Sequence, residues 1–248
     1  MSDLEEQRKV FDTIDEDDIE FIEYSIDEDT ETYHDDIAKL SDEAKKKQQK
    51  AEFNLKHEII SWILMFVAAV GIAAFVSNFV LMNAVVPTGS METTIPTGSR
   101  MIGLRLAYTF SEPERGDIII FKSPYNDDED YVKRIIGLPG EKVVIEDSKV
   151  YIYNQDGTLK LGPLDEPYVK DKVWTEQGEK YEFDVPEDRY LVLGDNRVNS
   201  KDARTWYNEI KASGGNLEEV YIHKDKILAQ ALFIYWDSFT IFEDVKYE

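Results

Sequence analysis

The longest feature of the hydrophobic pattern is an apolar run of 23 residues from Ile59 to Leu81. No charged residue occurs between Ile59 and Met91. As an α-helix the run would be roughly 35 Å long, which matches the hydrocarbon core of a bilayer, about 30 Å thick, with some tilt. Trp62, near one end, suits the aromatic belt of a membrane interface. We therefore predict a transmembrane helix over residues 59–82.

Two other interpretations fit this run less well. A buried helix of a soluble domain is seldom so long and so uniformly apolar. A cleaved signal peptide has a shorter apolar core close to the N-terminus, followed by small residues, whereas this run begins nearly sixty residues into the chain. The pattern favours a permanent anchor.

Beyond the apolar run, the pattern changes to short β-branched and aromatic segments separated by turn signals. These segments are Asp117–Lys122, Tyr131–Ile136, Lys142–Ile145, Lys149–Tyr153, Arg189–Leu193 and Ile227–Trp236. Asp156-Gly157 is a hairpin signal between Tyr153 and Leu159, and a short helix is expected over Thr205–Ala212. We predict a mainly β fold, with one antiparallel β domain over residues 83–248. Residues 146–186 are set apart as a candidate β subregion.

Charge changes the picture on the N-terminal side of the helix. The whole chain has 51 acidic and 28 basic residues and a net charge of −23, which disfavours nucleic acid as a partner because phosphates would be repelled. Residues 1–58 hold 20 acidic and 8 basic side chains. Residues 1–44 are too acidic and too poor in apolar residues to offset the entropy of ordering, so this tail is expected to be disordered. A basic, helix-prone collar follows and completes a cytoplasmic segment over residues 1–58.

The basic residues near the helix predict its orientation. Six lysines lie in the twenty positions before it, and one arginine, Arg100, lies in the twenty after it. By the positive-inside rule, the N-terminus is cytoplasmic and residues 83–248 lie outside. We expect a single-pass protein of the plasma membrane, with the lipid bilayer as a partner.

The residue types that are missing exclude several kinds of chemistry. Cysteine is absent, so thiol nucleophiles, cysteine-ligated zinc, iron–sulfur clusters and disulfides are excluded. His34, His57 and His223 are the only histidines, too few and too scattered for a histidine metal site. We expect no cofactor and no metal.

Three polar segments after the helix carry candidate chemistry. Ser90 stands between glycine and methionine. Lys133 and Arg134 lie in a strand-like run, where a period of two places them on opposite faces. Residues 194–204 are dense in side chains that bond to backbone. Taken singly, these are an inert serine, two basic side chains with solvated charges on apolar stems, and a polar loop.

Four motifs, taken together and in this order, resemble those of the type I signal peptidases, and the resemblance extends from about Val85 to Trp236. The motifs are P-T-G-S-M-E, R-G-D-I-I-I-F, Y-V-K-R-I-I-G-L-P-G-E and G-D-N-R-V-N-S-K-D-A-R. The resemblance implies a membrane-bound serine endopeptidase. Its substrates would be exported preproteins, cleaved after small residues in an Ala-x-Ala-like pattern, with export machinery as a further candidate partner. Thr93, where a proline is usual, and Val198, where an aspartate is common, depart from the pattern without removing a catalytic role.

The same resemblance implies a role for individual residues. Ser90 would be the nucleophile and Lys133 the general base. The backbone N–H of Ser90 and the hydroxyl of Thr88 would form the oxyanion hole. Three residues of the last motif would support the site. Ser200 would orient the lysine by a hydrogen bond, and Asp202 would pair with Arg204 to hold the loop against the site.

A lysine base must be neutral before it can accept a proton. At its ordinary pKa of about 10.4, only about 0.4% of a lysine is neutral at pH 8. Lowering the pKa to about 8 destabilises the ammonium by roughly 3 kcal/mol, and burial is the expected cause. Ser–Lys pairs can replace the histidine of an ordinary triad in this way.

Two rival functions remain open at the level of sequence. A membrane-anchored β-domain adhesin or scaffold would place Ser90 and Lys133 far apart. A self-cleaving Ser–Lys repressor would share the pair, but it would need a basic DNA-binding N-terminal domain and no anchor, the reverse of this chain's organisation.

Overall fold

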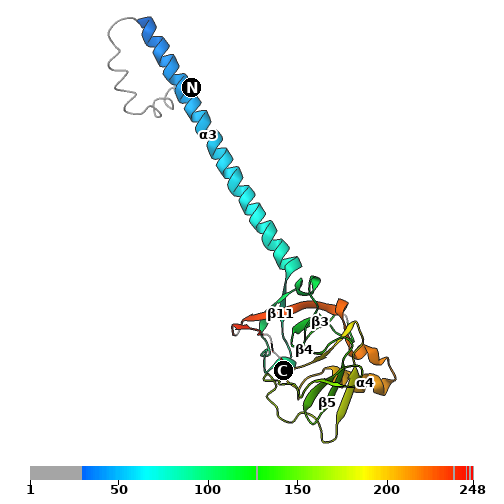
Figure 1. The fold of residues 1–248 in the computed structure, drawn as a ribbon. Helices are drawn as coiled ribbons and strands as arrows, with labels where there is room; N and C mark the ends of the chain where they lie inside the picture. Colours follow the sequence, from blue (N-terminus) through cyan, green and yellow to red (C-terminus); the bar gives the residue numbers. More distant parts are fainter. Residues whose placement is uncertain (1–29, 127, 237, 244, 246, 248) are drawn as a thin grey trace. The chain divides into compact units, whose positions relative to one another are not determined.

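The computed structural model describes residues 30–126, 128–236, 238–243, 245 and 247. The chain divides into two compact units, Met1–Ile72 and Ala73–Glu248. The first unit is helical where it is described, and the second is built mainly from antiparallel strands (Figure 1).

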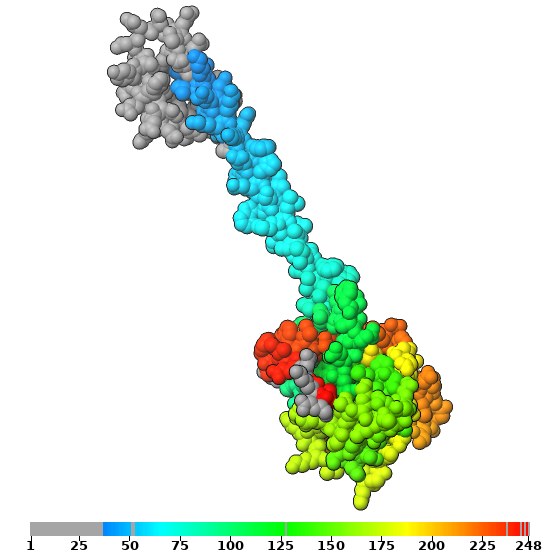
Figure 2. All heavy atoms as spheres, viewed as in Figure 1, coloured from blue at the N-terminus to red at the C-terminus, as the bar shows by residue number. Residues whose placement is uncertain are grey.

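The helix that carries the apolar run is much longer than the run itself. α3 spans Thr30–Phe75 and is followed by a π-helical turn, η1, over Val76–Val80. Within the described residues, one helix is long and apolar enough to cross a membrane. Its apolar side chains are exposed, and the atoms of this stretch are drawn in cyan in Figure 2. Trp62, for example, is 67% exposed. The prediction of one membrane-spanning helix is therefore supported by length and composition.

The ends of the helix differ from those that the sequence predicts. Leu81 and Met82 belong to the first strand rather than to the helix, because five residues of this strand pair with the next one. At the other end, residues 30–44 are helical, so the prediction of disorder is wrong for them. Alanine, lysine, glutamate and glutamine, which become frequent toward residue 50, are strong helix formers. The rest of the predicted acidic tail, residues 1–29, lies outside the described residues.

Two antiparallel sheets form the second unit. The larger sheet has the strand order β1-β2-β11-β3-β4-β9-β10, with β12 paired to β11. Its strands are β1 (Leu81–Val85), β2 (Arg100–Leu104), β3 (Ile118–Lys122), β4 (Asp130–Gly137), β9 (Arg189–Leu193), β10 (Ile222–His223), β11 (Ile227–Trp236) and β12 (Thr240–Ile241). The smaller sheet has the order β7-β6-β5-β8. Its strands are β5 (Lys142–Glu146), β6 (Lys149–Tyr153), β7 (Leu159–Leu161) and β8 (Lys180–Asp184).

Short helical segments connect these strands. They are the 3₁₀ turns η2 (Gly89–Met91), η3 (Ala107–Thr109), η4 (Leu217–Val220) and η5 (Lys224–Lys226), and the helix α4 (Ala203–Ser213). Asp202 caps the N-terminus of α4 by accepting a hydrogen bond from the N–H of Arg204. Trp206 is fully buried on this helix and packs against Phe121 of β3. α4 is thereby fixed beside the strands that carry the polar motifs.

The larger sheet has apolar side chains packed on both faces. Ile119 and Phe121 of β3 belong to one buried cluster, and Ile118 and Ile120 belong to another. Since alternate residues of a strand point to opposite faces, the two clusters cover opposite sides of β3. The neighbouring strand β4 is consequently covered on both sides. A polar side chain on either face of β4 must then be buried and needs a partner.

Candidate active site

Ser90 and Lys133 meet in the interior of the second unit. Nζ of Lys133 lies 2.7 Å from Oγ of Ser90 and also donates to the carbonyl of Val132 at 3.0 Å. Lys133 is 4% exposed and Ser90 7%. The two residues are 43 positions apart in the chain. They meet because β4 carries the lysine while η2 carries the serine. The contact is short enough for direct proton transfer.

The turn that carries Ser90 is held by its own backbone and by a distant loop. The N–H of Glu92 donates to the carbonyl of Gly89 at 3.1 Å, which closes η2. Asn196 then donates twice, from its N–H to the carbonyl of Ser90 at 3.1 Å and from Nδ2 to the carbonyl of Gly89 at 2.9 Å. Asn196 belongs to the polar motif over residues 194–204, but nothing in the sequence distinguishes it from its neighbours. The sequence predicts no role for it.

The environment of Lys133 favours its neutral form. Burial lowers the pKa of Lys133 to about 8, while the carboxylates of Asp202 and Asp195 act in the opposite direction. The ring of Tyr131 lies 5.6 Å from Nζ. At pH 8 about half of such a lysine is neutral, compared with a fraction of a per cent for an ordinary lysine. The expectation of a lysine whose pKa is lowered to about 8 by burial is matched.

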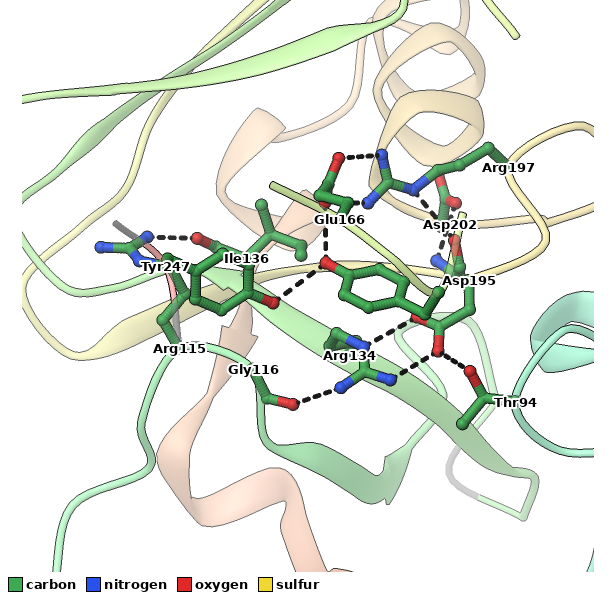
Figure 3. A network of polar contacts seen from close by, with 12 residues as sticks. Thr94, Arg115, Gly116, Arg134, Ile136, Glu166, Asp195, Arg197, Asp202 and Tyr247 are labelled. Atoms are coloured by element: carbon green, nitrogen blue, oxygen red, sulfur yellow. Dashed lines mark hydrogen bonds and ion pairs between the residues drawn. The ribbon is translucent and has the colours of Figure 1, made fainter. Parts of the chain in front are cut away.

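Arg134 has different surroundings from those that the sequence predicts. It is 3% exposed, and its guanidinium forms two hydrogen bonds with the carboxylate of Asp195, at 2.9 and 2.7 Å. Its Nη1 donates to the carbonyl of Gly116 at 2.7 Å (Figure 3). The solvated charges expected of these two residues taken singly are not found, because the strand is covered on both faces. The burial of Lys133 agrees with the role that the family resemblance implies, whereas the burial of Arg134 was not expected.

Asp202 and Arg204 are paired as expected. Nε and Nη2 of Arg204 donate to the two oxygens of Asp202 at 3.0 and 2.9 Å, and the N–H of Gly194 donates to Asp202 at 3.1 Å. Burial alone would raise the pKa of Asp202, but the charge and hydrogen bonds of Arg204 hold it below the ordinary value. Arg204 also donates to the carbonyl of Arg197 at 2.8 Å. The pair therefore fastens both ends of the loop over residues 194–202.

Ser200 lies near Ser90 but does not make the hydrogen bond that the sequence predicts. Lys133 is held by Ser90 and Val132 instead, and the buried hydroxyl of Ser200 helps to hold the pKa of Asp202 below its ordinary value. Gly194 separates Ser200 from the serine turn. A Cβ at Gly194 would lie 2.1 Å from Oγ of Ser200 and 2.5 Å from the carbonyl oxygen of Ser90. Only glycine lets the loop approach the serine turn so closely.

Thr88 comes just before the serine turn, in extended conformation. It occupies the N-cap position of η2, but its hydroxyl does not cap the turn, and the residue is exposed. The hydroxyl is therefore accessible to a ligand that reaches Ser90. No other residue that the sequence predicts for the site is exposed to the same degree.

Comparisons with known proteins identify the family. The family model described as "Signal peptidase, peptidase S26" matches residues 59–236. A probable signal peptidase I-2 from Synechocystis is 33% identical, over 68% of this chain and 70% of the relative. Signal peptidase IB from Staphylococcus aureus strain COL is 30% identical, over 73% of this chain and 92% of the relative. A solved signal peptidase I from Enterococcus faecalis is 28% identical and covers 48% of this chain and 97% of its own, with a TM-score of 0.35.

These matches and the fold define a serine endopeptidase with one candidate membrane helix. The chain belongs to the signal peptidase family, peptidase S26. The predictions of the family, of a mainly antiparallel β fold and of a hydrolase that removes signal peptides are confirmed. The adhesin or scaffold alternative is not supported. It would separate Ser90 from Lys133, whereas the two side chains are in contact.

Proposed function

We propose that Ser90 and Lys133 carry out peptide hydrolysis as nucleophile and general base. The observation that supports this most strongly is the 2.7 Å contact between two buried side chains, one of which has a pKa of about 8. Neutral Nζ accepts the hydroxyl proton as Oγ attacks the scissile carbonyl carbon. The resulting ammonium gives that proton to the leaving amine as the C–N bond breaks, and an ester forms on Ser90. A water molecule, deprotonated by Nζ, then hydrolyses the ester and releases the signal peptide with a free carboxylate.

The negative oxygen of the tetrahedral intermediate needs hydrogen-bond donors. We assign this task to the N–H of Ser90 and the hydroxyl of Thr88. The exposed, uncapped position of Thr88 supports the assignment. Asp202 and Arg204 would keep the loop against the serine turn, and Ser200 would pack beside Gly194 and act on the carboxylate of Asp202.

Thr88→Val tests the oxyanion hole. Valine keeps the shape of threonine and removes the hydroxyl, so kcat should fall by roughly 10²–10³-fold. KM should change little, because this hydrogen bond strengthens mainly in the transition state. Steady-state kinetics on a peptide substrate, with Thr97→Val as the matched control at an exposed threonine of the same loop, measures both constants. An unchanged kcat would restrict Thr88 to a structural role.

The substrate would bind in an extended conformation beside β1. This strand is at the edge of the larger sheet, and the chain continues directly from it to the turn of Ser90. An edge strand can accept a further strand through its backbone groups. We propose that the residues before the cleavage site bind in this way and that shallow pockets select small, Ala-x-Ala-like side chains. The substrates would be exported preproteins, and export machinery is a further candidate partner.

Residues 83–248 would lie on the outer face of the plasma membrane, with the N-terminus in the cytoplasm. Six lysines before the helix against one arginine after it support this orientation. A substrate whose apolar segment lies in the bilayer would then meet the enzyme where its cleavage site emerges. The proximity would contribute to the rate before any specific contact forms.

Protease added to intact spheroplasts tests this orientation. The enzyme should be degraded to a protected N-terminal fragment that contains residues 1–58 and the helix. Immunoblotting with tags at each end identifies the fragment, and lysed spheroplasts control for intrinsic resistance. Protection of the C-terminal tag in intact spheroplasts would reverse the orientation.

A further inference from the structure

The buried pair Arg134–Asp195 joins the two segments that carry the candidate dyad. Arg134 follows Lys133 on β4, and the N–H of Asp195 donates to Sδ of Met91, the residue after Ser90, at 3.3 Å. Thr94, in the segment that follows the serine turn, also donates to the carboxylate of Asp195 (Figure 3). A movement of this ion pair would therefore change the distance between lysine and serine.

Tyr168 covers this ion pair. The guanidinium carbon of Arg134 lies 4.0 Å from the centre of the Tyr168 ring, within range of a cation–π contact. The Tyr168 hydroxyl donates to Glu166 at 2.7 Å, and Glu166 in turn accepts two hydrogen bonds from Arg197. Tyr168 comes from the long connection between β7 and β8 of the smaller sheet. Through Arg134 it contacts β4 of the larger sheet.

Tyr247 forms a hydrogen bond with the hydroxyl of Tyr168. The two hydroxyl oxygens are 2.9 Å apart. Because the single proton of Tyr168 is donated to Glu166, the hydroxyl of Tyr247 must be the donor in this contact. Tyr247 also packs on Gly116, where a Cβ would lie 3.1 Å from the tyrosine ring. Gly116 is the residue whose carbonyl accepts from Arg134. Tyr247 thus contacts both groups that enclose the guanidinium. Figure 3 labels Tyr247, Gly116 and Arg134 of this arrangement.

We infer that Tyr168 and Tyr247, which we together call the clasp, position Lys133. They exclude water from the Arg134–Asp195 pair and keep this pair fixed relative to the serine turn. This inference rests on the proposed role of Lys133 as the base. Both tyrosines are positioning residues, since neither reaches the reacting atoms. Neither of them belongs to the motifs by which the sequence resembles its family.

The clasp has a predictable effect on the protonation of Lys133. Nζ donates to the hydroxyl of Ser90 and to the carbonyl of Val132, and the ring of Tyr131 lies beside it. The charged groups that act on it are the carboxylates of Asp195 and Asp202, which are paired with the guanidinium groups of Arg134 and Arg204. Opening the clasp admits water and weakens the neutralisation of Asp195 by Arg134. The less compensated carboxylate of Asp195 raises the pKa of the lysine, whose side chain points to the opposite face of β4 from Arg134. Burial also raises the pKa of both tyrosines, so the clasp itself stays protonated at the pH of an assay.

The deciding experiment is the pH dependence of kcat/KM for the full chain in detergent micelles, comparing Tyr247→Ala with the wild type. We expect the midpoint of the acidic limb to rise by about half a pH unit or more. The rate well below the midpoint should then fall about three-fold or more, and it should return toward the wild-type rate near pH 10. Tyr125→Phe is the matched control, because Tyr125 also donates to a carboxylate, that of Glu209 at 2.9 Å, and lies outside the clasp. Its limb should not move.

A midpoint in Tyr247→Ala that moves by less than half a unit, or a loss of activity that is equal at every pH, would overturn the inference. If Tyr247→Ala does not fold, Tyr168→Phe and Tyr247→Phe decide instead, because they keep both rings and remove one hydroxyl each. An upward shift in either supports the clasp, and no shift in both overturns it.

A second readout separates the clasp from the proposed function. The ¹³Cε chemical shift of Lys133 in lysine-labelled protein reports its pKa without turnover, and Lys133→Met identifies the signal. If peptide cleavage does not depend on Ser90 or Lys133, the proposed function fails while this titration still tests the clasp. If cleavage depends on both and the titration is unchanged in Tyr247→Ala, the clasp alone fails.

Discussion

Lys133→Arg should lose peptidase activity, with a fall in kcat of at least about 10³-fold, although it conserves the positive charge. Guanidinium does not give up its proton in proteins, so it cannot act as a base toward Oγ of Ser90. General base catalysis by a positioned side chain is worth about 10²–10⁴-fold, and loss of the only base should reach the upper part of that range. Lys133→Ala should be equally inactive. The measurement is single-turnover cleavage of a preprotein by purified, membrane-inserted enzyme.

Lys122→Arg is the matched control. Lys122 ends β3 in a partly exposed pair with Asp130, at 2.8 Å, so the same chemical change there should leave the rate unchanged. Substantial activity in folded Lys133→Arg would contradict the proposed mechanism. Arg134→Lys is not a suitable control, although strand alternation alone predicts that it is tolerated. The substitution removes one of two hydrogen bonds in a buried ion pair, and activity should fall together with stability.

Ser90→Ala should reduce cleavage by about 10⁴-fold or more, since removal of a covalent nucleophile leaves only binding and the oxyanion hole. Alanine removes one oxygen from a side chain that is 7% exposed, so the backbone turn should persist. N-terminal sequencing of the products should show wild-type cleavage after small residues and no new N-terminus with the variant. Substrate binding, measured by cross-linking, should be retained.

Ser99→Ala provides the corresponding control. Ser99 is fully buried, and its hydroxyl has no hydrogen-bond partner among the described residues. Its carbonyl accepts from the N–H of Val86, a contact that alanine keeps. Removal of this hydroxyl should therefore leave cleavage intact. Equal losses in the two variants would mean that Ser90→Ala acts through folding rather than chemistry.

Much of the β fold could be predicted from local pattern. The runs that became β3, β4, β6, β9 and β11 are rich in β-branched and aromatic residues, and the Asp156-Gly157 signal lies between the paired strands β6 and β7. β1 could not be distinguished from the membrane helix, because its residues continue the apolar run. β2 contains Gly103, which weakens a strand signal. β8 reads Lys-Tyr-Glu-Phe-Asp, an alternation of period two that is typical of a half-buried strand.

The candidate site was predictable only in part, because its geometry depends on tertiary packing. Periodicity shows that Lys133 and Arg134 point to opposite faces, but not that both faces are covered, so it does not predict the burial of Arg134. The pairing of Asp202 with Arg204 was expected from the motif, and the structure contains it. The hydrogen bonds of Asn196 to the serine turn join segments more than a hundred residues apart, and no local pattern indicates them.

Tyr168 and Tyr247 illustrate the same limit. Tyr168 lies in a polar stretch near a turn, and Tyr247 lies near the end of the sequence. Neither has a periodic pattern around it. Their role depends on a contact between residues 79 positions apart. Sequence could identify the chemistry of the dyad through resemblance, whereas the groups that position it are defined by packing.

The pH dependence of kcat/KM for the wild-type enzyme tests the central claim most directly, because it reports the protonation of the free enzyme's base. Lysine is neutral above its pKa, so the rate should rise with pH along a limb whose midpoint is about 8, the pKa that burial gives to Lys133. The residual activity of Lys133→Ala should show no such limb. A midpoint near the ordinary lysine value of about 10.4, or no limb that depends on position 133, would contradict the account of a buried neutral lysine acting on Ser90.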